Sequence, residues 1–499
     1  MAHMTLELPD APHVAALIDR WRTEYSAFAT LIDSAGDMRS ALRQFASACR
    51  SVQQYEMTID ALLAALTFAP DDTTLWRELA SVYQITEHDA PAESCALRAL
   101  ALDPDHAITW LQYASLEAKL QHTDRSEAAY QRALSLDPAL GDAHLGLGLL
   151  YLGSRKFDNA ITHLHRSLAW GGADAVTHLC LGQALYMAGR FGESADAFER
   201  AATFAPLEGI TLRLYARART FASIAGGGLH DAMARYPALA GAEVEPLDDI
   251  LRAAFSLFSA YGMRDAAVAV ARQRLDSRPD DPEQLYLLDA VQGRPHDHAP
   301  AAYVETHFDE FAGGFDSKLV DVLGYRVPQH LADLLSSCRL TFAAMLDLGC
   351  GTGLAAAPLQ RFGGRLTGVD LSAKMLAVAA DRGIYDALIK SDVMDYLRTT
   401  NSTFDLVFAT DLLIYFGRLD DLIDAIARSL APGGIFAVSI ERSNERDVLL
   451  LPSGRFAHSE TYFESAMAGH FDIERKLQTE LRIEAGAPVT GVLYVMRGR

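Results

Sequence analysis

The first part of the chain places large apolar side chains at helical spacing between helix-breaking residues that recur at a constant interval. Pro70, Pro104 and Pro138 are each 34 residues apart, and further steps of 34 reach Gly172 and Pro206. Proline and glycine are typical of helix ends and of the turns after them. After each of these positions a large residue and then a small one follow in the same register: Leu79-Ala80, Tyr113-Ala114, Leu147-Gly148, Leu181-Gly182 and Tyr215-Ala216. This period predicts stacked pairs of antiparallel helices.

The repeat unit resembles that of the tetratricopeptide repeat family. The residues that fit the family's order are Trp76, Leu79, Ala80, Tyr83 and Pro104. The resemblance implies a helical array over residues 11–290, with an irregular stretch at about 220–248, where Gly226–Gly228 interrupt the second helix of one repeat. It also implies a concave surface that binds a peptide, a carrier or a second copy of the chain. The alternative is that the following domain fills this groove.

After a Gly- and Pro-containing linker at residues 291–302, the pattern changes. From about Phe342, short apolar runs alternate with helical stretches, which predicts a mostly parallel sheet covered by helices. The run Ala343–Leu348 leads directly into the glycine loop Gly349–Gly353. A strand, a glycine loop and a helix in this order bring the backbone close to a nucleotide-like ligand. The spacing is GxGxG, because Leu354 stands where a dinucleotide-binding loop would have its third glycine.

Asp347 and the glycine loop read LDLGCGTG, which resembles motif I of class I S-adenosylmethionine-dependent methyltransferases. Four further landmarks follow in that family's order: Asp370 after the run 365–369, Asp392 after 387–390, Asp411 after 404–409, and a fifth run after Pro432-Gly433-Gly434. The resemblance implies a Rossmann-like α/β domain over residues 303–499.

The same resemblance implies which residues bind S-adenosylmethionine, with S-adenosylhomocysteine as the product. Gly349, Cys350, Gly351 and Gly353 form the loop near the methionine part, and Asp347 lies at its base. The other roles are Asp370 for the ribose, Leu371 and Val393 for the adenine ring, Asp392 for the adenine amine, and Asp411 or its neighbour's carbonyl for the cofactor's amino group. The alternative for each acid is an ordinary strand-end or helix-cap residue.

Residues 303–340 resemble the N-terminal helical cap of bacterial methyltransferases that are fused to tetratricopeptide repeats. Tyr303, His307 and Phe308 lie on one predicted helix face. Aromatic faces attract cations such as a methyl sulfonium, so this cap is expected to close over the methyl donor. The alternative is a docking helix between two domains.

Three residues are candidates for a general base: Glu441, His458 and His307. A base is needed only if the acceptor carries a proton of high pKa. The alternative for each is a capping or surface role. The segment after the fourth strand lacks Asn/Asp-Pro-Pro-Tyr, which speaks against methylation of adenine or glutamine amines.

The composition indicates which kinds of partner and which cellular compartment to expect. The formal net charge is −21, which repels phosphate backbones and speaks against a nucleic acid partner. Five scattered cysteines without CxxC spacing favour reduced thiols and no metal site. The sequence has neither a leader-like start nor a membrane-length apolar run, so a cytoplasmic protein is expected.

Taken together, these patterns predict an all-α tetratricopeptide-repeat solenoid followed by a Rossmann-like methyltransferase domain. The predicted reaction is methyl transfer to a small-molecule, lipid, saccharide or carrier-bound acceptor, with oxygen favoured. The repeats are expected to recruit a protein or carrier, or to form a homodimer. The alternatives are a protein methyltransferase whose repeats bind its substrate, and a non-catalytic adaptor.

Overall fold

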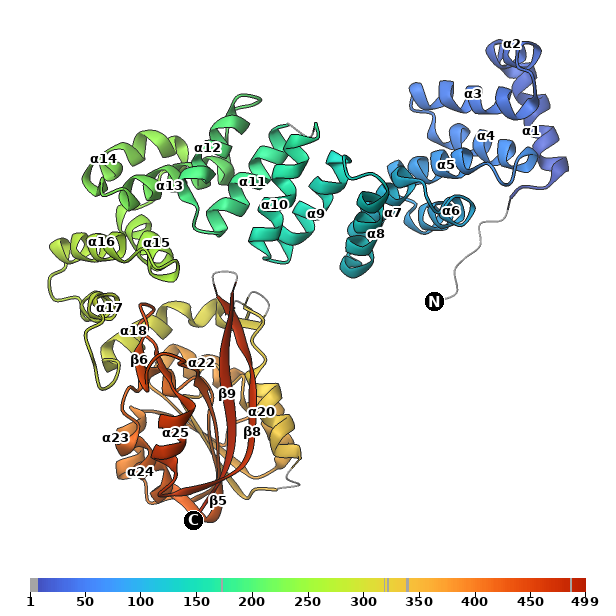
Figure 1. The fold of residues 1–499 in the computed structure, drawn as a ribbon. Helices are drawn as coiled ribbons and strands as arrows, with labels where there is room; N and C mark the ends of the chain where they lie inside the picture. The colour runs from blue at the N-terminus through green and yellow to red at the C-terminus, as the bar shows by residue number, and fades with distance from the viewer. Residues whose placement is uncertain (1–7, 172–173, 318, 321–322, 338–340, 485–486) are drawn as a thin grey trace. The chain divides into compact units, whose positions relative to one another are not determined.

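The computed structural model describes residues 8–171, 174–317, 319–320, 323–337, 341–484 and 487–499, apart from the side chains of residues 310 and 311 (Figure 1). The chain divides into two compact units. The first contains the residues up to Tyr186 together with Asp196–Leu207. The second contains Met187–Ala195 and Glu208–Arg499.

The first unit is built of helices that pack against their neighbours in the chain. They are α1 (Ala11–Glu24), α2 (Ser26–Ser34), α3 (Met38–Ser51), α4 (Tyr55–Phe68), α5 (Thr73–Ile85), α6 (Asp89–Leu102), α7 (Ala107–Lys119), α8 (Thr123–Leu136), α9 (Gly141–Gly153), α10 (Phe157–Ala169), α11 (Ala175–Met187) and part of α12 (Phe191–Ala202). The pairs α3 and α4, α5 and α6, α7 and α8, and α9 and α10 pack closely. This arrangement confirms the predicted all-α repeat array.

The large residue six positions after each proline closes the end of the preceding helix. Trp76 Nε1 donates to the Pro70 carbonyl at 2.7 Å, and Trp110 makes the equivalent bond at 2.8 Å. His144 takes the same place, with Nε2 3.3 Å from the Pro138 carbonyl. The histidine therefore packs in the same way as the tryptophans, as the repeat register predicts.

The small residue of each repeat allows its two helices to approach. A Cβ on Gly148 would lie 2.8 Å from the side chain of Leu164, and a Cβ on Gly182 would lie 3.0 Å from Phe198. Both distances are shorter than a packed core tolerates without movement.

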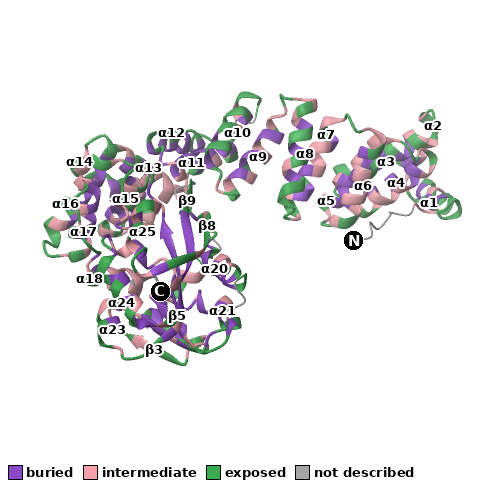
Figure 2. Cartoon of the chain, turned by 60° about the horizontal axis from the view of Figure 1, so that its bottom comes forward, coloured by how far each residue is buried: buried purple, intermediate pink, exposed green. Residues whose placement is uncertain are grey.

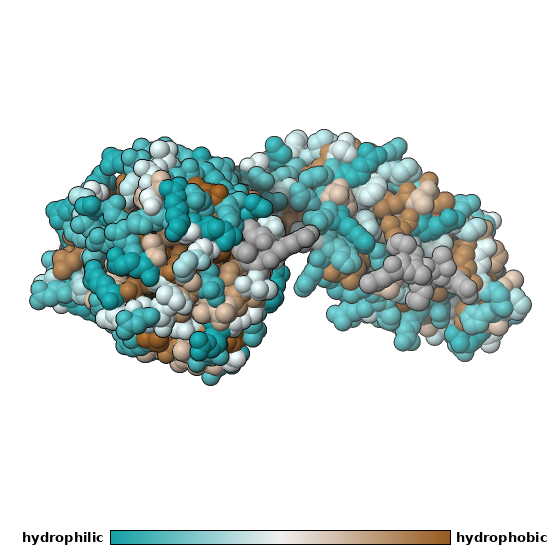
Figure 3. Space-filling model, turned by 90° about the horizontal axis from the view of Figure 1, so that it is seen from below, coloured by the Kyte–Doolittle hydropathy of each residue, from teal (hydrophilic) through white to brown (hydrophobic). Residues whose placement is uncertain are grey.

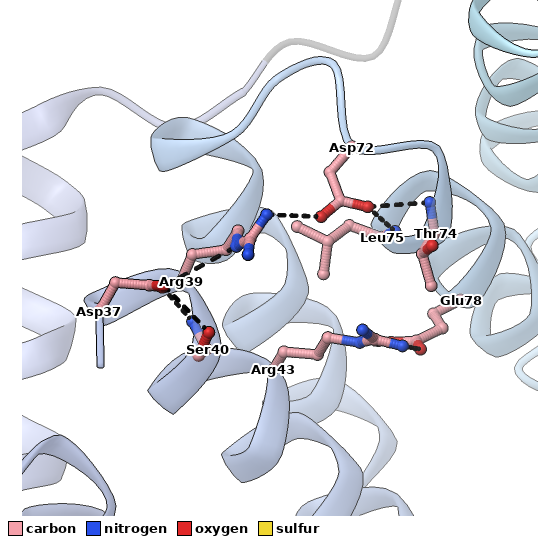
Figure 4. A network of polar contacts seen from close by, with 8 residues as sticks. All are labelled: Asp37, Arg39, Ser40, Arg43, Asp72, Thr74, Leu75 and Glu78. Atoms are coloured by element: carbon pink, nitrogen blue, oxygen red, sulfur yellow. Dashed lines mark hydrogen bonds and ion pairs between the residues drawn. The ribbon is translucent and has the colours of Figure 1, made fainter. Parts of the chain in front are cut away.

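Exposed ion pairs join the first two of these helix pairs (Figure 4). Arg39 Nη1 lies 3.3 Å from Asp72 Oδ2, and Arg43 Nη2 lies 2.7 Å from Glu78 Oε1. Asp72 also accepts hydrogen bonds from backbone N–H groups in the first turn of α5. Arg43 and Arg50 line a polar groove of about 390 Å³ formed by α3, α4 and α5.

The second unit begins with further helices. They are α13 (Gly209–Ala225), α14 (Leu229–Ala240), the short 3₁₀ helix η1 (Gly241–Glu243), α15 (Leu247–Ala260), α16 (Arg264–Ser277) and α17 (Pro282–Gln292). Gly226–Gly228 form the turn between α13 and α14, where Gly227 has a φ of +88°. Most of 220–248 is therefore helical, which differs from the expected interruption of a second helix. A glycine run marks a break in a helix, but from sequence it does not say between which two helices the break falls.

A seven-stranded sheet forms the centre of the α/β part, in the order β3-β2-β1-β4-β5-β9-β8. Its strands are β1 (Ala344–Leu348), β2 (Arg365–Asp370), β3 (Ala387–Lys390), β4 (Phe404–Ala409), β5 (Leu430–Glu441), β8 (Phe471–Glu484) and β9 (Ala487–Gly498). β1 to β5 pair in parallel, and β9 is antiparallel to β5 and β8. A separate pair is made by β6 (Val448–Leu450) and β7 (Phe456–His458). The Rossmann-like fold class is thereby confirmed.

Alternate side chains of the strands enter two core layers, as the two-residue period of a strand requires. Ile435 and Ala437 pack with Leu331, whereas Phe436 and Val438 pack with Phe463. The central strands β1, β4 and β5 are largely buried, whereas β3 and β8 at the two edges are mostly not (Figure 2). The surrounding helices are α18 (Ala301–Phe311), η2 (Ala312–Gly314), α19 (Phe315–Ser317), α20 (Val327–Ser336), α21 (Ala356–Leu359), η4 (Gln360–Phe362), α22 (Ala373–Asp381), α23 (Val393–Thr399), η5 (Leu413–Tyr415), α24 (Asp420–Ser429) and α25 (Glu460–Met467).

The segment between α17 and α18 lies on the loop after β4. Ala299 N–H donates to the Tyr415 carbonyl at 2.8 Å. The Asp297 carbonyl accepts from Gly417 N–H at 2.8 Å and from Arg418 N–H at 3.0 Å. The backbone of the predicted linker is thus hydrogen-bonded to the α/β part at two of its residues.

The surface in view in Figure 3 is mostly hydrophilic, with scattered hydrophobic areas. Within the described residues, no helix combines the length and the apolar character needed to cross a bilayer.

Candidate active site

The glycine loop lies where β1 ends, beside the ends of β2 and β4. Gly349, Gly351 and Gly353 have φ values of +66°, +54° and +84°, a region that side chains other than glycine rarely adopt. A Cβ on Gly349 would lie 2.9 Å from Leu412, whereas a Cβ on Gly351 would meet nothing within 4 Å. The loop is therefore packed at its back and open at its middle glycine, so a ligand can approach its backbone closely.

Backbone hydrogen bonds fix this loop on β2. Gly349 N–H and Cys350 N–H both donate to the Val369 carbonyl, at 2.9 and 3.0 Å. The thiol of Cys350 is buried, and burial raises its pKa. Cys350 therefore contributes its backbone to the loop and not a reactive thiolate.

Asp370 lies at the end of β2 and faces the same loop. Its Oδ2 accepts from Gly351 N–H at 2.8 Å, and its Oδ1 accepts from Ser372 N–H at 2.8 Å. Burial raises the pKa of Asp370, and these two backbone hydrogen bonds act in the opposite direction. Each carboxylate oxygen can accept a second bond, so the residue fits a ligand with two neighbouring hydroxyls.

Asp347 is buried at the base of the loop. Tyr385 donates its hydroxyl to Oδ2 at 2.7 Å, while Oδ1 has no hydrogen-bond partner among the described residues. Burial is the main cause that raises the pKa of Asp347 to about 7. A buried carboxylate oxygen without a partner fits a ligand that brings a hydrogen-bond donor or a positive charge.

Asp392 caps α23, because its Oδ1 accepts from Met394 N–H at 2.8 Å and from Asp395 N–H at 3.3 Å. The helix-cap alternative thus describes one of its oxygens, and the other remains for a ligand. Val393, the first residue of α23, is buried, and Leu371, which directly follows β2, is half-buried.

The predicted cap is tied to this edge of the sheet by hydrogen bonds. Ser372 Oγ donates to Asp309 at 2.5 Å, and Thr352 Oγ1 donates to Asp316 at 2.5 Å. Arg382 also forms an ion pair with Asp316. The acids of the cap therefore hold it against the glycine loop and the Asp370 turn.

His307 and His458 lie in different surroundings. His307 is half-buried in the cap, with its ring centre 5.7 Å from that of Tyr303 and 5.5 Å from that of Phe308. His458 has no exposed surface, and its Nε2 lies 3.3 Å from the Gly417 carbonyl. Burial lowers the pKa of His458 to about 4. This placement favours a packing role for His458, because a substrate proton has no path to its ring.

Glu441 and Asp411 lie together at the ends of β5 and β4. Arg482 Nη2 donates to Glu441 Oε2 at 2.5 Å, so this carboxylate is already paired. Asp411 has a φ of +53°, an uncommon and strained conformation for a residue with a side chain. Its carboxylate accepts from Ser439 Oγ at 3.3 Å. Strain of this kind clusters at functional sites.

Tyr385 and Arg482 are site residues that sequence reasoning did not find. Tyr385 follows α22 in a loop without a motif, and Arg482 is one polar residue in a long edge strand. No alternating pattern marked Arg482, because Leu481 and Arg482 are both buried and the pairing of β8 with β9 shifts register between Glu480 and Arg482.

Comparison with known families decides the class of the domain. Residues 346–438, from β1 to β5, match the model of a methyltransferase domain. This segment is therefore similar to methyltransferase domains. Residues 107–140, which contain α7 and α8, match the model of a tetratricopeptide repeat. Both recognitions from the sequence are confirmed.

Three curated proteins illustrate the similarity. Trans-aconitate 2-methyltransferase from Paracidovorax citrulli is 34% identical over 116 residues, which are 23% of this chain and 44% of that protein. Ubiquinone biosynthesis O-methyltransferase from Xylella fastidiosa is 30% identical over 160 residues, 30% of this chain and 64% of that protein. The protein of the same name from Xanthomonas oryzae pv. oryzae is 27% identical and covers 39% and 87% of the two chains. This chain thus spans less than two thirds of the first two relatives.

Proposed function

We propose that this chain transfers a methyl group from S-adenosylmethionine to an oxygen of a small-molecule, lipid, saccharide or carrier-bound acceptor. The methyltransferase domain supports the reaction class. Two relatives whose names state O-methylation support oxygen as the methylated atom. In this proposal the catalytic domain covers 303–499 with its cap at 303–340, and the repeats cover 11–290.

One observation carries the proposal: the open glycine loop and Asp370 face each other across 2.8 Å at the ends of β1 and β2. The cofactor would supply an electrophilic methyl group there. Asp370 would bind the ribose hydroxyls, and Asp347 with Gly349, Cys350, Gly351 and Gly353 would hold the methionine part. Leu371 and Val393 would pack on the adenine, and the remaining oxygen of Asp392 would accept from the adenine amine.

The four described cysteines, Cys49, Cys95, Cys180 and Cys350, form no disulfide. Reduced thiols of this kind support a cytoplasmic location as part of the proposal.

Substitution of Asp370 tests cofactor binding directly. Asp370→Asn is expected to weaken the binding of S-adenosylhomocysteine about 10- to 100-fold, since charge-assisted hydrogen bonds contribute roughly 1.5–3 kcal/mol. Isothermal titration calorimetry on the full chain measures this. Asp381→Asn, an exposed aspartate at the end of α22, makes the same chemical change as a control. Equal affinity for the two variants, or no binding by the wild type, would contradict the proposal.

The repeats add recruitment or self-association to this function. A matched tetratricopeptide repeat and the polar groove beside Arg43 and Arg50 support an interaction role. Homo-oligomers are the commoner outcome for such surfaces, and we favour a dimer. Light scattering on the full chain decides between them, because recruitment of another partner predicts the mass of one chain. A protein methyltransferase whose repeats bind its substrate is the alternative.

A further inference from the structure

A cluster of charged side chains, separate from the glycine loop, lies where β4 and β5 end. It consists of Asp411, Glu441, Arg455, Arg482 and Glu484. Arg482 is at its centre, with Nη2 2.5 Å from Glu441 Oε2 and Nε 2.7 Å from Glu484 Oε1. Arg455 forms an ion pair with Glu484 and lies 3.6 Å from Glu441. The side chains of Arg482 and Glu441 are 3% and 7% exposed, whereas those of Asp411, Arg455 and Glu484 are 21–31% exposed, so the cluster is buried at its centre and partly open at its rim.

Two donors of this cluster lack hydrogen bonds. Arg482 Nη1 and Arg455 Nε are buried and have no hydrogen-bond partner among the described residues. Arg482 Nη1 lies 3.7 Å from Asp411 Oδ2, too far for a direct hydrogen bond. Buried guanidinium donors are rarely left unpaired, so a ligand oxygen beside this pair, within hydrogen-bond reach of both groups, would complete the cluster. The Asp411 side chain is 21% exposed, so the pair can be approached from one side.

The charges of the cluster restrict which chemical group of an acceptor can bind beside Arg482 and Asp411. Two guanidinium groups face three carboxylates, so the positive charge is already matched by protein groups. A carboxylate or phosphate on the acceptor would add another negative charge to a site with little water, which is unfavourable. A neutral hydroxyl adds no charge and can both accept from a guanidinium and donate to a carboxylate.

From this arrangement we propose that the acceptor presents a neutral hydroxyl beside the pair of Arg482 Nη1 and Asp411 Oδ2, within hydrogen-bond reach of both, and that Asp411 takes its proton. Arg482 donates to the acceptor oxygen and fixes its position. The oxygen forms the new C–O bond while its proton passes to Asp411. The electron pair of the broken S–C bond stays on sulfur, which leaves as S-adenosylhomocysteine. This inference rests on the proposed function and names the substrate class within it.

The groups around Asp411 suit a proton acceptor. Burial raises the pKa of Asp411, and Arg482, Arg455 and the Ser439 hydroxyl lower it, while Glu484 raises it. Burial also raises the pKa of the Tyr325 phenol, and the charge of Asp411 adds to this. The pKa of Tyr415 is raised in the same way, chiefly through burial. Both phenols therefore stay protonated, and Asp411 is the group beside Arg482 Nη1 that is left to accept a proton.

The test uses the full chain, labelled S-adenosylmethionine and cell extract as the source of acceptors. Asp411→Asn is expected to lower the rate of label incorporation at least 100-fold, the usual scale for loss of a general base. Asp411→Asn should still bind S-adenosylhomocysteine, which shows that it folds, with a lower affinity if Asp411 also contacts the cofactor's amino group as the family resemblance implies. Asp421→Asn, an exposed aspartate on α24, is the matched control and keeps both properties.

A second measurement does not depend on turnover. In the presence of saturating S-adenosylhomocysteine, ligand-observed NMR compares catechol, benzoate and benzylamine as probes of a hydroxyl, a carboxylate and an amine. Catechol is expected to bind best, and Asp411→Asn should weaken it at least fivefold. The wild-type rate should also rise with pH through the raised pKa of Asp411. Asp411→Asn removes this rise, whereas Asp411→Glu keeps it with a shifted midpoint.

Each contrary result has a distinct meaning. Tighter binding of benzoate or benzylamine than of catechol, or a wild-type rate in Asp411→Asn, overturns the assignment of Asp411 and leaves the proposed function standing. A wild type that binds S-adenosylhomocysteine but labels nothing overturns the proposed function and this inference with it.

Discussion

Arginines pair with carboxylates in two contrasting regions of this molecule. On the helices of the first repeats, the Arg43 and Glu78 side chains are 47% and 30% exposed. At the sheet edge of the catalytic domain, those of Arg482 and Glu441 are 3% and 7% exposed. The distances are similar, so the comparison isolates the effect of water. An exposed pair contributes about 0–1 kcal/mol, whereas removal of one partner from a buried pair costs about 3–5 kcal/mol.

The largest effect is expected from Arg482→Leu. This change leaves the buried carboxylates of Glu441 and Glu484 without their central cation, so the free energy of unfolding of the catalytic domain should fall by about 3–5 kcal/mol. Thermal unfolding followed by circular dichroism measures the loss. Addition of Glu441→Gln should recover part of it. A loss of unfolding free energy below ~1 kcal/mol would mean that the pair of Arg482 and Glu441 contributes no more than an exposed ion pair.

A buried acid without a cation provides the intermediate case. The pKa of Asp347 is raised to about 7, so the folded protein holds its proton where the unfolded chain has lost it. The free energy of unfolding should therefore fall as the pH rises from about 4 to 7, by about 1.4 kcal/mol per pH unit where the folded and unfolded chains differ by this one proton.

Asp347→Asn should remove this part of the pH dependence and stabilise the ligand-free protein above pH 7. Urea unfolding at several pH values measures the slope. Identical slopes for the wild type and the variant would mean that Asp347 is ionised in the folded protein.

The smallest effect is expected from Arg43→Gln. Its pair with Glu78 is screened by water and salt, so the unfolding midpoint of the repeats should change by less than the equivalent of ~1 kcal/mol. Measurement at low and high salt separates the charge from the packing of the side chain. A larger loss that persists in high salt would show that the aliphatic part of Arg43, and not its charge, stabilises the repeats.

Local patterns predicted the fold well because the relevant contacts are short in sequence. The run from Phe404 to Ala409 is β4 as expected, and the Trp76 and Pro70 contact spans only six residues. The glycine loop and Asp370 were likewise placed together, because consecutive parallel strands end at one edge of a sheet.

The charged cluster could not be predicted from the sequence, because its residues are far apart in the chain. Asp411 follows β4 and Arg482 lies in β8, and these two strands are not neighbours in the sheet. No spacing rule connects them, and Glu441 alone resembled a free base until its partner was visible. The choice between the two roles given for His458 was also open from the sequence, because whether a histidine is packed or accessible depends on residues far along the chain. The roles of the other site residues stay predictions.

The backbone hydrogen bonds of Asp297 and Ala299 to the loop after β4 make the junction after α17 stiff. A flexible tether would let the helices that end at α17 and the catalytic domain tumble separately. Here, the segment that follows α17 is instead hydrogen-bonded through Asp297 and Ala299 to the stretch that carries Tyr415 and Gly417. Tyr286 on α17 adds a second attachment, since its hydroxyl donates to the Gly454 carbonyl at 2.8 Å. Helix α17 is therefore attached both to the backbone that follows the strained Asp411 and to the turn between β6 and β7.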